Sequence, residues 1–130
     1  MFSITTRVRY QETDKGGRVY HSNYLVWLDM ARTEYLRSKG IVYAELEDAG
    51  YFLVVKEINL NYRASARFDD EVRIDITKII KQKFRVDFHY NIVHNLDDKL
   101  MVSAFVQVVC INKSGKPIII PNMITEIIKE

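Results

Sequence analysis

The chain has 130 residues, of which 48% are hydrophobic and 28% charged, and this is the size and composition of one folded domain. Its 19 basic and 17 acidic residues are interspersed and give a formal net charge of +2, so the sequence lacks the basic stripe of a nucleic-acid-binding protein. We therefore expect a single soluble domain spanning residues 1–130.

Local patterns disfavour two further classes of protein. No apolar run reaches the roughly 18 residues that a membrane-spanning helix needs, and the N-terminal segment lacks the basic and then apolar layout of a signal peptide. The sequence therefore indicates a cytoplasmic protein. Cys110, the only cysteine, lies in an apolar run with no histidine at ligand spacing, which predicts a core residue and neither a disulfide nor a metal site.

A strand and a glycine turn are predicted at the start of the chain. Bulky and polar residues alternate from Phe2 to Tyr10, which is the period of a strand with two different faces. Asp14 follows, and the nearby Gly16 and Gly17 permit backbone conformations and close approaches that side chains forbid. The pattern places a carboxylate beside an open, flexible corner.

A long helix is predicted over residues 23–38. Ser22 or Asn23 is the expected N-cap, and the first N–H groups of any helix have no acceptor within it. Residues at helical spacing form an apolar stripe that should pack on a core: Tyr24, Trp27, Leu28, Ala31 and Tyr35. Other residues should form a polar face: Asp29, Arg32, Thr33, Glu34 and Arg37.

The rest of the chain predicts a short helix and a series of strands. The helix covers residues 43–49, and strands joined by short polar links cover residues 57–64, 71–81, 84–93 and 100–112. Short links make neighbouring strands antiparallel. Ile58 and Tyr62 are expected on a buried face, because apolar and polar residues alternate there.

Two features complete the predicted fold. The strand over residues 100–112 is largely apolar on both faces, which predicts the most central position, and a short strand at 118–120 precedes a terminal helix opening at Pro121. A twisted antiparallel sheet of five or six strands that curls around one long helix satisfies all of these patterns. The predicted fold class is therefore α+β, with the hotdog architecture.

The segment from Tyr10 to Arg32 resembles the motif of the hydroxybenzoyl-CoA thioesterase family, with its closest likeness to the small bacterial acyl-CoA thioesterases associated with the Tol-Pal genes. The matching positions are Tyr10, Glu12-Thr13-Asp14, Gly16-Gly17, Val19-Tyr20-His21, Asn23-Tyr24 and Ala31-Arg32. The order of elements agrees over essentially the whole chain, although beyond Leu60 the likeness is less diagnostic.

This resemblance implies an enzyme that hydrolyses acyl-CoA thioesters to a carboxylic acid and coenzyme A. Asp14 matches the catalytic aspartate of the family, His21 matches the helix-start position whose backbone N–H polarises the thioester carbonyl, and Tyr10 also fits the pattern. The resemblance further implies no metal or prosthetic group. It implies homodimers built by edge-to-edge sheet pairing, often paired again into tetramers, with active sites between protomers.

The chemistry of a thioester explains why these residue types would be needed. The carbonyl oxygen becomes negative during attack, and a helix start offers N–H donors and a partial positive charge. Asp14 would act as a nucleophile or as a general base, or it is simply a turn residue. Tyr10 would pack at the strand end and orient Asp14 or the substrate. The expected substrate-binding residues are Gly17, Ser22, Asn23, Tyr24, Arg63 and Arg67.

Two other functions remain open from the sequence. One is a hotdog hydratase or dehydratase, which needs a histidine and a carboxylate as an acid-base pair. The other is a non-catalytic protein that binds acyl thioesters, because a fold does not fix a function. The physiological acyl group and the choice between coenzyme A and acyl carrier protein are not encoded in any motif.

Overall fold

The computed structural model describes residues 1–128, and this part of the chain forms one curled sheet and three α-helices. The elements in chain order are β1 (Phe2–Arg7), the 3₁₀ turn η1 (Tyr10–Glu12), α1 (Asn23–Ser38), α2 (Tyr43–Asp48), β2 (Phe52–Tyr62), β3 (Glu71–Lys81), β4 (Arg85–His94), β5 (Leu100–Ile111), β6 (Pro117–Ile118) and α3 (Asn122–Thr125).

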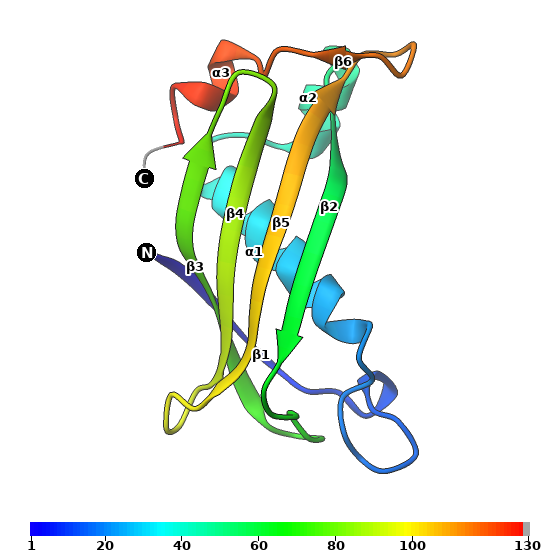
Figure 1. Cartoon of the computed structure of the whole chain (residues 1–130), viewed down its shortest axis with the longest axis vertical. Coiled ribbons are helices and arrows are strands. Elements are labelled where there is room, and N and C mark those ends of the chain that lie inside the picture. The colour runs from blue at the N-terminus through cyan, green and yellow to red at the C-terminus, as the bar shows by residue number, and fades with distance from the viewer. Residues whose placement is uncertain (129–130) are drawn as a thin grey trace.

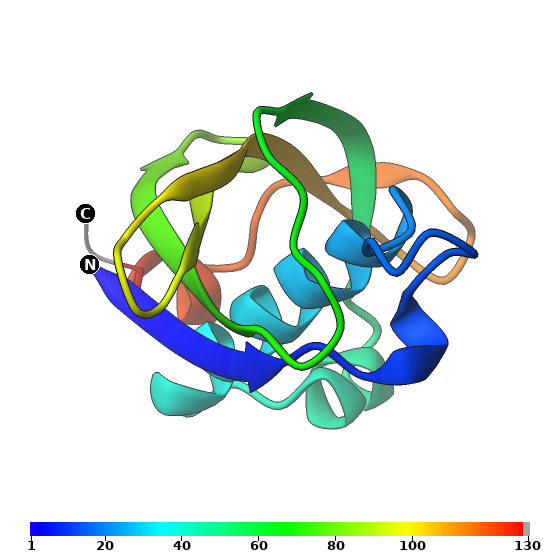
Figure 2. The ribbon, with the colours of Figure 1, turned by 90° about the horizontal axis from the view of Figure 1, so that it is seen from below.

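The sheet has the strand order β1-β3-β4-β5-β2, and all neighbouring strands are antiparallel. The short β6 pairs with the end of β5 and completes a six-stranded sheet. Figure 1 shows α1 running along one face of the sheet, and Figure 2 shows the sheet curled over this helix. The predicted hotdog fold is confirmed.

The core lies between α1 and the concave face of the sheet. All five residues of the predicted apolar stripe are buried, with Trp27 and Ala31 fully enclosed. They face alternate residues of β3, β4 and β5, because side chains that point to one face of a strand recur every second residue. Cys110 is buried among them, as predicted. Within the described residues, no helix is long and apolar enough to cross a membrane.

Arg32 departs from the prediction, because it lies in the core and not on a polar face. Its side chain is buried, and its guanidinium donates to the Tyr90 hydroxyl at 3.2 Å and to Asp29 at 2.5 Å. Burial raises the pKa of Tyr90 to about 12, so the hydroxyl stays neutral. A helical pattern alone misplaced Arg32 because its partner Tyr90 lies on a distant strand.

The first strand is shorter than predicted. β1 ends at Arg7, and Tyr10 lies in η1 with 78% of its surface exposed. Val8 still points into the core, and its backbone bonds with Asp69 and Asp70 at 3.0 and 2.8 Å. The chain bends after Val8. The alternation of bulky and polar residues in the sequence therefore extends beyond the strand itself, which ends at Arg7.

Two predictions about the strands were also wrong: the burial of Ile58 and Tyr62 in β2, and the central position of β5. β2 is an edge strand, so Ile58 and Tyr62 are 42% and 49% exposed although their register faces the core. β4, and not β5, occupies the middle of the sheet. β5 is paired on both sides, with β2 along one side and with β4 and then β6 along the other.

The terminal helix is also shorter than the apolar pattern suggested. α3 covers only Asn122–Thr125, and Met123 is half exposed. Ile124 and Ile128 nevertheless pack into the core, and the Lys81 ammonium donates to the carbonyls of this segment. The C-terminal segment therefore closes one end of the core.

The buried contact of Arg32 leads to a stability prediction. Arg32→Met keeps an apolar stem in the core but leaves the Tyr90 hydroxyl without its donor, so we expect the free energy of unfolding to fall by about 1–3 kcal/mol. Urea denaturation measures this loss. Arg37→Met, at an exposed position of the same helix, is the matched control and should change stability by less than about 0.5 kcal/mol.

A second substitution tests the stated cause. Adding Tyr90→Phe to Arg32→Met removes the orphaned hydroxyl and should recover part of the lost stability. Equal stability of the Arg32→Met and Arg37→Met variants would show that the buried hydrogen bond contributes nothing.

Candidate functional site

Asp14 lies on a tight hairpin that directly precedes α1. Thr13 pairs with Val19, and the Asp14 N–H donates to the Arg18 carbonyl at 2.7 Å. Gly17 closes the turn by donating its N–H to the Asp14 carbonyl at 3.0 Å. The φ of Gly17 is +81°, in the left-handed region that favours glycine, which explains why this residue type is needed here.

The Asp14 carboxylate has one occupied oxygen and one free oxygen. Oδ1 accepts hydrogen bonds from the backbone N–H groups of Gly16 at 2.8 Å and Arg18 at 3.2 Å. Within residues 1–128 no protein group donates to Oδ2, and the side chain is exposed. Asp14 therefore stabilises the turn through Oδ1, as expected of a turn residue, while its Oδ2 has no hydrogen-bond donor among residues 1–128.

The hairpin is tied to the start of α1 through the backbone carbonyl of Glu12. This carbonyl accepts the Tyr20 N–H at 2.9 Å and the side-chain amide of Asn23 at 2.8 Å. Ser22 occupies the N-cap position but its side chain makes no capping bond. The predicted N-cap position is confirmed at Ser22, although no side chain caps the helix, and the Asn23 side chain holds the hairpin instead.

The Glu12 carboxylate is the buried link between the turn and the helix. It accepts hydrogen bonds from the Arg9 N–H at 2.8 Å, the Arg9 guanidinium at 3.3 Å and the Trp27 indole at 3.0 Å. Burial disfavours the charged form, but these donors outweigh that cost and lower the pKa of Glu12. Sequence reasoning missed this role, because the motif contains Glu12 but gives no sign of its distant partner.

The N–H groups at the start of α1 are open to a ligand. Within residues 1–128 the backbone N–H groups of His21 and Ser22 donate to no protein acceptor. The His21 carbonyl is bound from the side, because the Tyr62 hydroxyl at the end of β2 donates to it at 2.9 Å. The alternating pattern of β2 predicted only a buried face for Tyr62 and gives no sign of this contact.

The loop between β2 and β3 supports the hairpin from its other side. Arg67 forms a backbone bridge with Arg18, and the Phe68 N–H donates to the Gly17 carbonyl at 3.3 Å. Tyr10 lies edge-on against Phe68, with ring centroids 5.7 Å apart. The predicted packing role of Tyr10 is thus limited to an exposed contact at the rim of this region.

The remaining predicted binding residues fall into two groups. Arg63 and Arg67 are exposed, and within the described part of the chain their guanidinium groups form no ion pair. Tyr24 is buried, its hydroxyl accepts the Ala66 N–H at 3.1 Å, and burial raises its pKa. The Tyr24 side chain is therefore part of the core in a single protomer, although its backbone belongs to the helix start.

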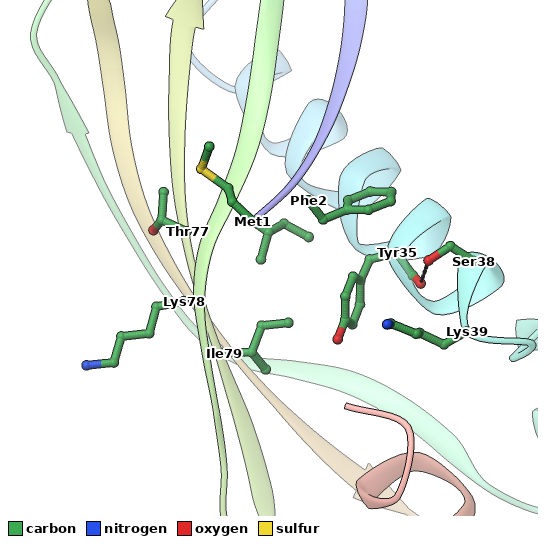
Figure 3. Close-up of a pocket in the computed structure, with 9 residues that line it drawn as sticks. Met1, Phe2, Tyr35, Ser38, Lys39, Thr77, Lys78 and Ile79 are labelled. Carbon is green, nitrogen blue, oxygen red and sulfur yellow. Dashed lines mark hydrogen bonds between the residues drawn. The ribbon is translucent and has the colours of Figure 1, made fainter. Parts of the chain in front are cut away.

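Four hollows of the described chain are lined by no residue of the hairpin or of the helix start. One of about 280 Å³ lies between the end of α1 and β3, where Tyr35 and Lys39 face Phe2 and Ile79 while Lys78 points away (Figure 3). A helix rises about 1.5 Å per residue, so this hollow is some 20 Å from the helix start. Asp14 thus lies on an open surface and not in a closed pocket of one protomer.

The fold and the site together define a class of protein, a hotdog domain with an exposed carboxylate on a hairpin that is hydrogen-bonded to the start of its long helix. The sequence model of the thioesterase-like superfamily matches residues 8–128, and the chain belongs to this superfamily. The resemblance inferred from the segment between Tyr10 and Arg32 is confirmed.

Individual relatives agree over nearly the full length. The chain is 34% identical to the acyl-CoA thioester hydrolase YbgC of Escherichia coli O6:H1, over 100% of this chain and 97% of that protein. It is 33% identical to the putative acyl-CoA thioesterase YneP of Bacillus subtilis, over 85% and 80% of the two chains. The solved structure of a DHNA-CoA thioesterase from Staphylococcus aureus has a TM-score of 0.83 at 30% identity, covering 91% of this chain and 79% of that one.

The buried Glu12 carboxylate generates a prediction about stability and pH. Both oxygens of the Glu12 carboxylate accept hydrogen bonds, so in Glu12→Gln the side-chain NH₂ group must face a donor and cannot accept from it. The free energy of unfolding should therefore fall by roughly 1–3 kcal/mol at neutral pH. Because folding lowers the pKa of Glu12, the charged carboxylate stabilises the fold above its unfolded value of 4.5 and loses this effect as the pH falls through the folded value.

Denaturation at a series of pH values measures this effect. The gap in stability between the wild type and Glu12→Gln should shrink as the pH falls below 4.5. Glu47→Gln, at an exposed position of α2, is the control and should show no such gap. A gap that is independent of pH would contradict a role for the Glu12 charge.

Proposed function

We propose that this protein is an acyl-CoA thioesterase that releases a carboxylic acid and coenzyme A. The observation that carries the proposal is the free Oδ2 of Asp14, on a hairpin fixed to a helix start whose His21 and Ser22 N–H groups have no protein acceptor among residues 1–128. The relatives at 33% and 34% identity are named as acyl-CoA thioesterases, which supports coenzyme A as the carrier of the acyl group.

The helix start polarises the thioester carbonyl. Negative charge develops on the carbonyl oxygen during attack, and preorganised N–H donors at a helix start stabilise such charge. The His21 and Ser22 N–H groups are the donors that the helix leaves open. The His21 imidazole is exposed beside Tyr20, and it is the backbone of this residue that the proposal requires.

Asp14 performs the attack or prepares it. In one route Oδ2 attacks the carbonyl carbon, the C–S bond breaks to release coenzyme A thiolate, and water then hydrolyses the mixed anhydride. In the other route Oδ2 accepts a proton from water, and this water attacks the carbonyl. Both routes use the same oxygen, while Oδ1 remains bound to the turn.

The exposed arginines provide contacts for the phosphates of coenzyme A. Arg67 lies on the loop that supports the hairpin, and Arg63 begins the same loop after β2. Guanidinium groups bind phosphate with paired hydrogen bonds. Gly17 and Asn23 fix the hairpin that carries Asp14 beside the helix start, and Tyr10 lies at the rim.

A second copy of the chain completes the site in this proposal. The β2 edge is open, and it carries four large hydrophobic residues that are at least 37% exposed: Val54, Val55, Ile58 and Tyr62. An open apolar edge favours pairing with another strand. Because Tyr62 touches His21, a copy that pairs with β2 lies beside the helix start.

Asp14→Asn tests the proposed chemistry. The Asn side chain keeps an oxygen that accepts the Gly16 and Arg18 N–H groups, so the turn and the fold should be preserved. An amide neither attacks a thioester nor accepts a proton from water, so kcat should fall by at least about a hundredfold with little change in KM. A thiol-trapping assay on a panel of acyl-CoA substrates measures turnover.

The matched control is Asp97→Asn. The Asp97 Oδ1 also accepts the N–H of the residue two positions later, at 3.0 Å, but on the distant turn between β4 and β5. This variant should retain wild-type turnover. If Asp14→Asn kept more than roughly a third of wild-type kcat, Asp14 would be a turn residue only. Conversion of the thioester without thiol release would indicate a hydratase, and binding without conversion would indicate a scaffold.

We also predict that the active protein is at least a dimer. Static light scattering should give a mass of no less than twice the 15.3 kDa of one chain. Ile58→Lys places a charge on the open β2 edge, and it should shift the population towards monomers and lower activity at the same protein concentration. A stable and fully active monomer of the wild type would overturn this prediction.

A further inference from the structure

The end of β2 makes a specific contact with the helix start. Tyr62 is 41 residues from His21 in sequence, and its hydroxyl donates a hydrogen bond of 2.9 Å to the His21 carbonyl. The His21 carbonyl and the Ser22 N–H belong to one peptide group. Within residues 1–128 the Ser22 N–H donates to no protein acceptor, so one end of this peptide group is held and the other is open.

The geometry of a peptide group transmits this contact. A trans peptide is planar, and its C=O and N–H point in opposite directions, so holding the oxygen also fixes the direction of the N–H. A hydrogen bond to the oxygen also polarises the group, which makes its N–H a stronger donor. The Tyr62 hydroxyl therefore acts on the Ser22 N–H without touching it.

We infer that Tyr62 is a positioning residue that orients and strengthens the Ser22 N–H as a donor to the substrate carbonyl. The inference rests on the proposed function, because it assigns Ser22 to the binding of the carbonyl oxygen. It adds a side chain from the edge strand to a site that the sequence motif confines to residues 10–32.

The Tyr62 hydroxyl is held firmly enough for this role. Its ring packs edge-on against the Tyr24 ring, with centroids 5.6 Å apart. Tyr24 is itself buried and bonded to the Ala66 N–H. In β2, Tyr62 pairs with Val102 of β5, so the backbone of the residue is also fixed. Burial raises the pKa of Tyr62, which keeps the hydroxyl protonated and able to donate at neutral pH.

Tyr62→Phe keeps the ring and removes only the hydroxyl. We expect kcat to fall about fivefold to tenfold, the size of one hydrogen bond, with KM within roughly twofold. Affinity for a trifluoromethyl ketone analogue of acyl-CoA, whose tetrahedral adduct mimics the intermediate, should fall by the same factor as kcat. Affinity for a thioether analogue without a carbonyl should not change, because this analogue has no carbonyl oxygen to accept a hydrogen bond from the Ser22 N–H.

A matched control and an independent readout complete the test. Tyr51→Phe removes a hydroxyl that forms no hydrogen bond within the described chain. It should leave kcat, KM and the affinities for both analogues unchanged. The Ser22 amide nitrogen resonance should move upfield in Tyr62→Phe, because the hydrogen bond to the preceding carbonyl is lost. This NMR signal needs no enzymatic activity, so it separates a failure of this inference from a failure of the proposed function.

Three results would overturn the inference. One is wild-type kcat in Tyr62→Phe while Asp14→Asn is inactive, which leaves the thioesterase proposal intact. Another is an unmoved Ser22 resonance. The third is a loss of affinity for both analogues together with a lower melting temperature, which would make Tyr62 a structural residue only.

Discussion

The buried Glu12 carboxylate is the constraint on which the arrangement of the site depends. One residue joins three parts of the chain, because its side chain accepts donors from Arg9 and Trp27 while its carbonyl holds the hairpin and Asn23. Trp27 is fully enclosed beneath the sheet, so the turn is hydrogen-bonded directly to a side chain of the core. A charged group in this place is stable only with its full set of donors, which makes the link specific.

The fold followed from the sequence because most of its signals are local. The helical stripe that includes Trp27 and Ala31 repeats within a few residues, and the alternation in β3 and β4 repeats every second residue. Such periods record which face of an element is buried. They do not record which strand lies at an edge, and this is why the exposure of Ile58 and the order of β4 and β5 were not predicted.

The site followed from the sequence only in part. Asp14, Gly17 and His21 were predicted as site residues because they lie in a short motif that resembles a known family. The contacts that hold them come from residues far away in sequence: Trp27 bonds Glu12, Tyr62 bonds His21, and Phe68 bonds Gly17. Arg32 was misplaced for the same reason, because Tyr90, which accepts its hydrogen bond, lies on β4. The sequence of one segment does not show which distant residues the fold brings into hydrogen-bonding contact with it.

The bond between Asp14 Oδ1 and the turn has a consequence for the entropy of the reaction. A free carboxylate on an exposed loop samples many rotamers, and a substrate that required one of them would bear the entropic cost of selecting it on binding. Here the Gly16 and Arg18 N–H groups fix the side chain when the hairpin forms. The loss of rotational freedom therefore belongs to folding, and in the proposed reaction the thioester meets an Oδ2 whose orientation is already determined.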